Sequence, residues 1–307
     1  MRLDVHQHIW TAPLIDALAA RTELPFVRRK GGIAELHAAE ERPCVIDLSS
    51  QTASRRTRLL DDDRIELAVI ALSSPIGIEA LPRDEALVVI GAHLDGVQAL
   101  GQRFAAWGPV PLDNPDPDDV DEVLARGCVG VSLPAGALAT PRELDAAAPL
   151  LHRIAQRGAP LFVHPGPTAR SAGREQEAPA HEPPWWQALT GYVSQMQAAW
   201  LAFASAGRSR HPHLTVIFSM LAGGAPLLSE RLDTRRGPLV DLGDPLTYYD
   251  TSSYGPTAIE AMARRVGSSQ LVYGSDRTVL EPLPSGREAI LQTAAAELLA
   301  PARLAAA

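Results

Sequence analysis

Close to its amino terminus the chain reads Leu3-Asp4-Val5-His6-Gln7-His8-Ile9-Trp10. In a β-strand, side chains two positions apart project from the same face, so His6 and His8 can reach one point in space. Val5 and Gln7 are expected to face away. Neutral imidazole is a common zinc ligand, and a catalytic site needs about three protein ligands and an open position for water. The sequence therefore predicts a metal site at the end of this strand, with further ligands from elsewhere.

Two later stretches close an apolar run with a residue that can bind a metal. They read Leu161-Phe162-Val163-His164 and Leu271-Val272-Tyr273-Gly274-Ser275-Asp276. Short apolar runs bounded by Pro and Gly are typical of buried parallel strands, whose last residues lie at their carboxyl ends. The candidate metal ligands are therefore His6, His8, His164 and Asp276.

Helix and strand patterns alternate along the rest of the chain. Further strands are predicted at 66–72, 104–110, 127–133, 214–219 and 246–250. Helices are predicted at 13–21, 54–63, 83–100, 118–126, 144–157, 186–203, 225–235, 256–266 and 287–299. Eight strands alternating with helices predict a single α/β domain over 1–307, a parallel (β/α)8 TIM barrel. An open doubly wound sheet is the alternative, although no glycine-rich phosphate loop follows the first strand.

One segment, residues 11–50, fits neither a single strand nor a single helix, and it contains a short predicted strand at 42–47. In a TIM barrel the segment after the first strand is a loop over the active face. We interpret 11–50 as a small insertion that forms a lid. A peripheral subdomain that only packs against the barrel is the alternative.

The three metal-binding stretches, in this order and spacing, resemble the amidohydrolase superfamily. The likeness extends over nearly the whole chain and is greatest to the amidohydrolase-related branch, which includes aminocarboxymuconate-semialdehyde decarboxylase and similar aromatic-acid decarboxylases. The resemblance implies a distorted (β/α)8 barrel of the metal-dependent hydrolase type. It also implies that Asp276 both completes the metal shell and accepts a proton from the attacking water, and that the chain can form a homodimer.

The sequence departs from this resemblance after the sixth strand. Relatives usually carry a histidine there, in an H-x-G-G sequence, which acts in substrate polarisation and proton transfer. Here the run reads Phe218-Ser219-Met220-Leu221-Ala222-Gly223-Gly224, without a histidine. His181, in the predicted loop after the fifth strand, is our first candidate to replace it. Alternatively the reaction needs only metal, water and Asp276, or the protein binds a ligand without catalysis.

Two residues are expected to contact the substrate. Trp10 directly follows the histidine-bearing strand and is expected to form a pocket wall. Arg231 resembles a family arginine, and a guanidinium suits bidentate binding of a substrate carboxylate. For Arg231, a surface salt bridge with Glu230 or Asp233 is the alternative.

The lysine content limits which catalytic mechanisms are possible. Lys30 is the only lysine in the chain, and its surroundings, residues 28–32, are interpreted as a basic loop. We therefore do not expect a Schiff-base aldolase, nor a two-metal hydrolase bridged by a carboxylated lysine, as some members of the resembling superfamily are, and we expect one divalent ion. Zinc is favoured, although three histidines and an aspartate also suit manganese and iron.

Charge and cysteine content indicate the setting of the protein. The chain has 28 Lys and Arg against 36 Asp and Glu, a net charge of −8, which argues against nucleic acid or an anionic membrane as a partner. Cys44 and Cys128 are interpreted as reduced core residues of a cytoplasmic protein without a secretory signal.

The apolar segments are too short to span a membrane. Abundant Ala and Arg with scarce Lys indicate a bacterial source.

These features predict a mononuclear metal-dependent enzyme that acts on a small-molecule substrate. The main hypothesis is hydrolysis of a C–N or C–O bond in a small cyclic or aromatic substrate, with Asp276 as proton acceptor. The alternative is non-oxidative decarboxylation of a small aromatic or unsaturated acid. The missing histidine weakens the alternative more, because decarboxylase relatives use that residue in acid–base work. A non-catalytic metal- or ligand-binding relative is the third hypothesis.

Overall fold

The computed structural model describes residues 2–39, 41–168, 182–183 and 185–281. Within these ranges a parallel eight-stranded sheet follows the order of the sequence. Its strands are β1 (Leu3–Gln7), β5 (Leu67–Ile70), β6 (Phe104–Pro109), β7 (Gly130–Pro134), β8 (Leu161–His164), β9 (Val216–Phe218), β10 (Thr247–Asp250) and β11 (Leu271–Val272).

The two edges of this sheet meet, so the barrel is closed. Beyond β11 the chain runs alongside β1, where Gln7 and Arg277 form a parallel bridge. The Val5 amide donates to the Tyr273 carbonyl at 2.9 Å. Each of the eight strands predicted from the sequence overlaps one of the observed strands. The expected (β/α)8 barrel is confirmed, and the open doubly wound sheet is excluded.

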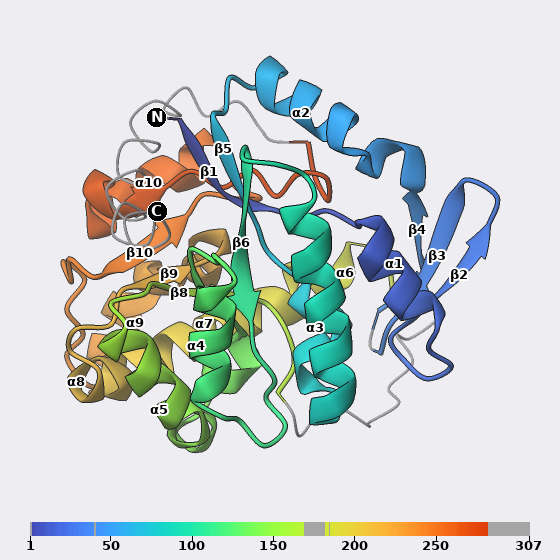
Figure 1. Ribbon diagram of the computed structural model, residues 1–307. Helices are drawn as coiled ribbons and strands as arrows, with labels where there is room; N and C mark the ends of the chain where they lie inside the picture. Colours follow the sequence, from blue (N-terminus) through green and yellow to red (C-terminus); the bar gives the residue numbers. More distant parts are fainter. Residues whose placement is uncertain (1, 40, 169–181, 184, 282–307) are drawn as a thin grey trace.

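Helices cover the outside of the barrel (Figure 1). They are α1 (Ala12–Ala19), α2 (Ala53–Asp62), α3 (Arg83–Gln98), α4 (Asp118–Ala125), α5 (Pro141–Gln156), α6 (Trp186–Leu189), α7 (Gly191–Ala202), α8 (Arg208–Arg210), α9 (Ser229–Thr234) and α10 (Pro256–Val266). The helix predicted at 186–203 is divided at Thr190. The helix predicted at 287–299 lies outside the described residues. No helix in the described ranges is long and apolar enough to cross a membrane.

An irregularity in β1 determines which side chains enter the barrel. The register between β1 and β5 shifts between Asp4 and Gln7. Val5 belongs to the interior cluster with Phe162, yet the His6 ring also lies close to Phe162, at 5.2 Å between ring centroids. The expectation that Val5 faces away from His6 is therefore wrong, because such an irregularity re-aims the side chains that follow it.

Two aromatic rings form the floor beneath the histidines. Trp107 and Phe162 are fully buried and stacked, with centroids 5.1 Å apart and planes 7° from parallel. Trp107 Nε1 donates to the Val5 carbonyl at 2.8 Å. Close packing of this kind leaves little room for side-chain movement. The carboxyl end of β1 therefore packs against side chains with little freedom to move.

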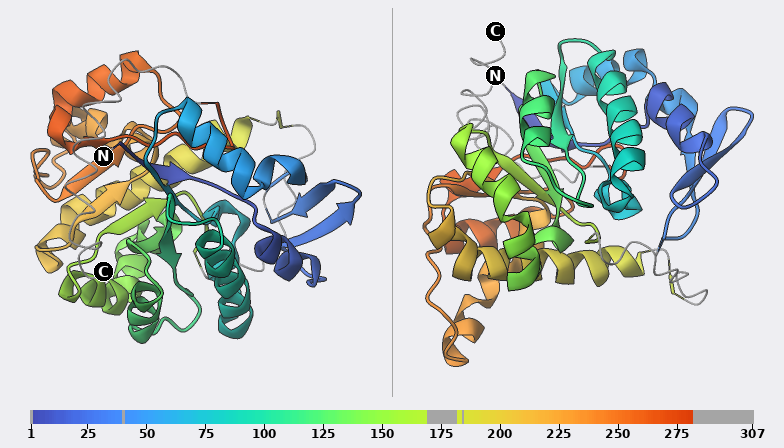
Figure 2. Two further views of the ribbon diagram at one scale, coloured as in Figure 1. Left: turned by 45° about the horizontal axis from the view of Figure 1, so that its top comes forward. Right: turned by 60° about the horizontal axis from the view of Figure 1, so that its bottom comes forward.

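The segment after α1 forms a second, antiparallel sheet that projects from the side of the barrel (Figures 1 and 2). Its strands are β2 (Phe26–Lys30), β3 (Ile33–His37) and β4 (Cys44–Asp47), and β4 matches the strand predicted at 42–47. Buried side chains attach this sheet to the main hydrophobic core, namely Val27, Ala34, Leu36 and Ile46. The insertion is therefore anchored by apolar packing.

Two local expectations for the insertion are wrong. The sequence pattern places Arg28 to Lys30 in a loop, whereas they lie in β2 with exposed side chains. β2 is an edge strand, where charged side chains are common because they discourage further strand pairing. Cys44 is expected in the core but is exposed, while Cys128 is buried as expected.

Candidate metal centre

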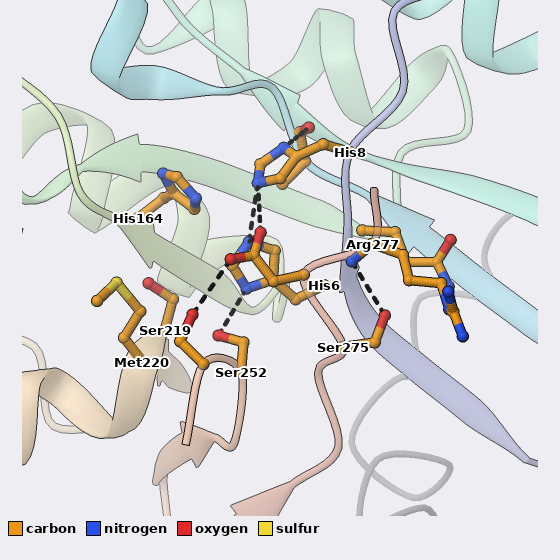
Figure 3. Close-up of polar contacts among 12 residues, drawn as sticks. His6, His8, His164, Ser219, Met220, Ser252, Ser275 and Arg277 are labelled. Atoms are coloured by element: carbon orange, nitrogen blue, oxygen red, sulfur yellow. Dashed lines mark hydrogen bonds and ion pairs between the residues drawn. The ribbon is translucent and has the colours of Figure 1, made fainter. Parts of the chain in front are cut away.

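Three buried imidazoles converge at the carboxyl ends of β1 and β8 (Figure 3). His6 lies in β1, His8 directly follows it, and His164 closes β8. Their ligand nitrogens all lie within 4.8 Å of one another, and the Nε2 atoms of His6 and His8 are 3.0 Å apart. These strand ends meet because the parallel strands of a barrel place their carboxyl ends on one face.

Asp276 adds a carboxylate to this cluster. Its Oδ1 lies 3.4 Å from His8 Nε2 and 3.8 Å from His6 Nε2. The Asp276 amide donates to the His6 carbonyl at 2.9 Å, and Ser253 Oγ donates to Asp276 Oδ2 at 3.2 Å. The structure therefore brings together the four residues predicted as metal ligands.

Hydrogen bonds at the second ring nitrogen fix how the imidazoles are oriented. His8 Nδ1 lies 2.8 Å from the Ala71 carbonyl, and His164 Nδ1 lies 2.9 Å from the Pro165 carbonyl. A carbonyl only accepts, so both Nδ1 atoms carry the proton and both Nε2 lone pairs are free to bind a metal. Inward lone pairs beside a carboxylate repel one another unless a cation neutralises them. The donor set therefore fits one divalent ion.

The third imidazole has a carboxylate partner that the sequence analysis does not identify. His6 Nδ1 lies 2.8 Å from Asp250 Oδ2 and 3.1 Å from Ser252 Oγ. Asp250 closes β10 and is fully buried. Gly274 lies so close that a Cβ there would be 2.9 Å from Asp250 Cγ, so only glycine fits. A carboxylate that closes an apolar strand, as Asp276 does, is the sequence signal that could have identified Asp250.

Replacing Asp250 with asparagine is expected to weaken metal binding while the barrel stays folded. The amide keeps the shape of the side chain but removes the charge that orients His6, and partners of this kind typically contribute 10- to 100-fold in metal affinity. We expect the metal dissociation constant to rise by about 10- to 100-fold, measured by competition with a chelator. Asp241→Asn, at an exposed position before β10, is the control. Unchanged affinity in Asp250→Asn would contradict this orientation role.

Buried charges favour a cation at the cluster. Burial alone would lower the pKa of His6, but nearby carboxylates, chiefly Asp250, outweigh it and raise the pKa to about 9. Burial would raise the pKa of Asp276, but the His8 hydrogen bond and the histidine charges lower it to about 2. Burial, followed by the charges of His6 and His8, lowers the pKa of His164. At neutral pH the cluster thus combines an ionised carboxylate at Asp276 with a protonated imidazole at His6 and a neutral imidazole at His164.

A chain of hydrogen bonds beneath the cluster fixes the end of β1. Arg56 of α2 is fully buried and donates to the His8 carbonyl and to Gln7 Oε1, both at 2.7 Å. Gln7 Nε2 donates to Asp4 Oδ2 at 2.8 Å, and Asp4 Oδ1 accepts from the Ser275 amide at 3.0 Å. These bonds join the first and last stretches of the barrel, so the ligands that they carry are held in one arrangement.

The turn after β9 stands where relatives are expected to carry a histidine. The turn begins with Ser219, and the next residue, Met220, is buried. Figure 3 shows both side chains beside the histidine cluster. All residues from Met220 to Gly224 have φ between 50° and 74°. This left-handed conformation costs about 1–2 kcal/mol for each non-glycine residue, and such strain often occurs at functional sites. Gly223 and Gly224 adopt it without that steric cost.

The other candidate residues are placed as follows. Trp10 lines a small cavity together with His8 and with His93 of α3. Arg231 is exposed on α9, and within the described residues its side chain forms no hydrogen bond or ion pair with the histidines, Glu230 or Asp233. His181 lies outside the described residues. The roles of Trp10, Arg231 and His181 stay predictions.

A further buried carboxyl, Glu79, lies outside the cluster and makes stability depend on pH. Ser74 Oγ donates to Glu79 Oε1 at 2.5 Å, and burial raises the pKa of Glu79 from 4.5 to about 7. Between these two values the folded state holds a proton that the unfolded state releases, so stability falls as pH rises.

Glu79→Gln is therefore expected to reduce the loss of stability on going from pH 5 to pH 8. The reduction should be roughly 2–3 kcal/mol, because one pKa unit corresponds to about 1.4 kcal/mol. Urea unfolding of the metal-free wild type and variant at both pH values measures it. An equal pH dependence in the two proteins would show that Glu79 is not protonated in the folded state.

Comparisons with known proteins give a likeness in structure. No family model matches the chain, and no curated protein matches it. Among solved structures, IDCase from Metarhizium anisopliae superposes with a TM-score of 0.70 at 19% identity, covering 99% of this chain and 94% of that one. An amidohydrolase II superposes with a TM-score of 0.70 at 16% identity, covering 98% and 100%.

A third structure was solved with a metal and a small aromatic acid. It is 5-carboxyvanillate decarboxylase from Novosphingobium aromaticivorans, complexed with manganese and 4-hydroxy-3-methoxy-5-nitrobenzoic acid. Its TM-score is 0.67 at 16% identity, covering 98% of this chain and 96% of that one. At these identities the likeness establishes the fold. The chain thus has the same barrel fold as these structures, and the fold that the sequence resemblance implies is confirmed.

Proposed function

We propose that the protein is a mononuclear metal-dependent enzyme that decarboxylates a small aromatic acid without an oxidant. The observation that carries the proposal is the convergence of three oriented imidazoles and one carboxylate at the carboxyl face of the barrel. Structural neighbours that decarboxylate aromatic acids favour this reaction over hydrolysis. The preference between the two hypotheses is thus reversed relative to the sequence analysis.

His6, His8, His164 and Asp276 would hold the ion. When bound, it would supply Lewis acidity that orients a carboxylate oxygen and stabilises negative charge. The chain's own task is then to position the acid and move one proton. The carbon–carbon bond breaks with its electron pair left on the ring carbon, and a proton takes the place of the departing carbon dioxide. Asp276 accepts at Oδ2 from Ser253 Oγ and is ionised at neutral pH, so we assign to it the transfer of this proton from a water molecule to the ring carbon.

The proposed ion is zinc, with manganese as the competing candidate. A site of three histidines and one aspartate suits either ion, and a structural neighbour contains manganese. Elemental analysis of the protein purified without added metal would measure the ion directly. About one zinc per chain would support the proposal, whereas manganese as the main ion would replace zinc in it.

The reaction is tested by incubating the metal-loaded protein with hydroxylated benzoic acids, including 2,6-dihydroxybenzoate, and measuring released carbon dioxide. Release in step with loss of the acid, and none from a chelator-treated sample, is the expected result. If the metal is bound but no carbon dioxide forms from any acid tested, decarboxylation is the wrong reaction.

Hydrolysis is the second candidate, and one observation favours it. Asp276 has a lowered pKa and is ionised at neutral pH, as a proton acceptor for water must be. Incubation with aromatic lactones and amides distinguishes the two reactions, because hydrolysis releases an acid and no carbon dioxide. A protein that binds metal and aromatic acids but catalyses neither reaction would be the non-catalytic relative.

We also infer a cytoplasmic, bacterial protein that forms a homodimer. The net charge of −8 supports a small-molecule substrate rather than nucleic acid or an anionic membrane as the partner. Light scattering at several protein concentrations measures the oligomeric state, and a monomer at all of them would contradict the dimer.

A further inference from the structure

Helix α7 is held against the rest of the molecule near both of its ends. Near the amino end, Tyr192 Oη donates to Glu41 Oε1, in the connection between β3 and β4, at 2.5 Å. Near the carboxyl end, the buried Trp200 donates from Nε1 to Tyr249 Oη at 3.0 Å. Side chains between these two contacts therefore project from a helix that is fixed by contacts outside the metal cluster.

The turn that follows β9 contacts α7 at its first residue and again four residues later. Ser219 Oγ donates to Sδ of the fully buried Met196 at 3.9 Å. Gln197 Nε2 donates to the Gly223 carbonyl at 2.8 Å. A Cβ at Gly223 would lie 2.6 Å from the Val193 carbonyl oxygen, so only glycine lets the turn approach the helix this closely. The turn and α7 therefore pack as one unit.

The bond from Gln197 stabilises a backbone conformation that the turn does not favour by itself. Met220, Leu221 and Ala222 have φ between 50° and 54°, which is unfavourable for residues with a Cβ. Such a conformation persists only where the surrounding structure fixes it. Within the turn, the Ala222 amide donates to the Ser219 carbonyl at 2.8 Å. Gln197 adds a contact from outside the turn, at the end opposite to Ser219.

Asp250 connects this turn to the metal cluster. Its Oδ1 accepts from the Met220 amide at 3.4 Å and from the Ser252 amide at 2.7 Å. Its Oδ2 lies 2.8 Å from His6 Nδ1. The first amide of the left-handed run and a metal-binding imidazole therefore share one carboxylate. A relaxed turn would move the Met220 amide, and the carboxylate would lose one of the two amides that hold it.

We propose that Gln197 is a positioning residue of the metal site. It holds the turn of residues 220–224 in its left-handed form, the turn holds Asp250, and Asp250 orients His6. A coupling between two sites is reciprocal, so a bound ion also stabilises the turn. This inference rests on the metal site of the proposed function, and it holds for either reaction proposed there.

Gln197→Met tests the proposal, because methionine keeps the length of the side chain and removes the donor to Gly223. The zinc dissociation constant, measured by competition with a chelator, is expected to rise by about 3- to 10-fold, the value of one neutral hydrogen bond. In the metal-free variant the amides of residues 219–224 should exchange with solvent faster by a similar factor. In the wild type, zinc should slow their exchange.

A second substitution separates positioning from a general loss of stability. Ala222→Gly removes the steric cost of the left-handed backbone at that position, so adding it to Gln197→Met should restore nearly wild-type zinc affinity. Ser194→Ala, which removes an exposed hydroxyl that donates to the Gly191 carbonyl within α7, is the control and should keep wild-type affinity.

Three results would overturn the inference while leaving the proposed function intact. They are unchanged zinc affinity in Gln197→Met, a loss of affinity that Ala222→Gly does not reverse, and an equal loss in Ser194→Ala. If the wild type binds neither zinc nor manganese, the metal site and the proposed function fail, and this inference fails with them.

Discussion

A variant in which His6 and His8 are both replaced by alanine is expected to bind no metal and to lose at least about 10³-fold in kcat/KM. Each contributes an Nε2 atom to a cluster whose ligand nitrogens lie within 4.8 Å of one another, so one histidine and one carboxylate remain. Two ligands do not complete a site for a divalent ion. A bound ion stabilises the transition state by several kcal/mol. Each change of about 1.4 kcal/mol in the activation free energy changes the rate tenfold.

Elemental analysis and circular dichroism of this double variant measure the outcome. The barrel is expected to stay folded, because the floor of Trp107 and Phe162 is unchanged. His152→Ala is the control and should keep its metal, because the His152 side chain is exposed on α5 and lies within hydrogen-bonding distance of Gln156. Stoichiometric metal in the double variant would show that the ion binds elsewhere.

Replacing Asp276 with asparagine is the second large effect. The amide cannot accept or pass on a proton, and positioned acid–base groups contribute about 10²- to 10⁴-fold. We expect kcat to fall by that factor. The backbone should keep its conformation, because Asp276 has a φ of 59° and asparagine tolerates the left-handed region well. The fall in rate can therefore be assigned to the lost carboxylate.

Saturating metal during the assay separates the two functions of Asp276. If the rate recovers when metal is added in excess, the residue acts only as a ligand. A persistent loss supports its function in proton transfer. Asp63→Asn is the control, because Asp63 pairs with the neighbouring Arg277, at 2.6 Å, without contacting the cluster.

Local pattern was sufficient to predict the barrel strands and the four clustered side chains. The sequence of a parallel strand that is buried on both faces is a short apolar run. Each predicted metal ligand lies at or next to the end of such a run. Since these ends share one face in a barrel, the order of the runs was enough to bring His6, His8, His164 and Asp276 together. The helices were likewise predicted from hydrophobic periodicity within short segments of the chain.

The edge strand β2 was missed because its pattern is not apolar. Arg28, Arg29 and Lys30 resemble a loop, and only pairing with β3 makes them a strand. The orientation of Val5 was wrong for a related reason. A register shift is a property of the pairing between two strands, and the spacing within one strand does not show it.

By itself the sequence determined the barrel, the order of its strands and the residues that meet at its carboxyl face, because these follow from hydrophobic periodicity along short segments. Only the tertiary structure decided that Asp250 orients His6 and that Glu41 binds Tyr192, a contact between residues 151 apart in the chain. Such polar contacts depend on how whole elements pack against one another. No local pattern encodes which two distant side chains that packing brings within hydrogen-bonding distance.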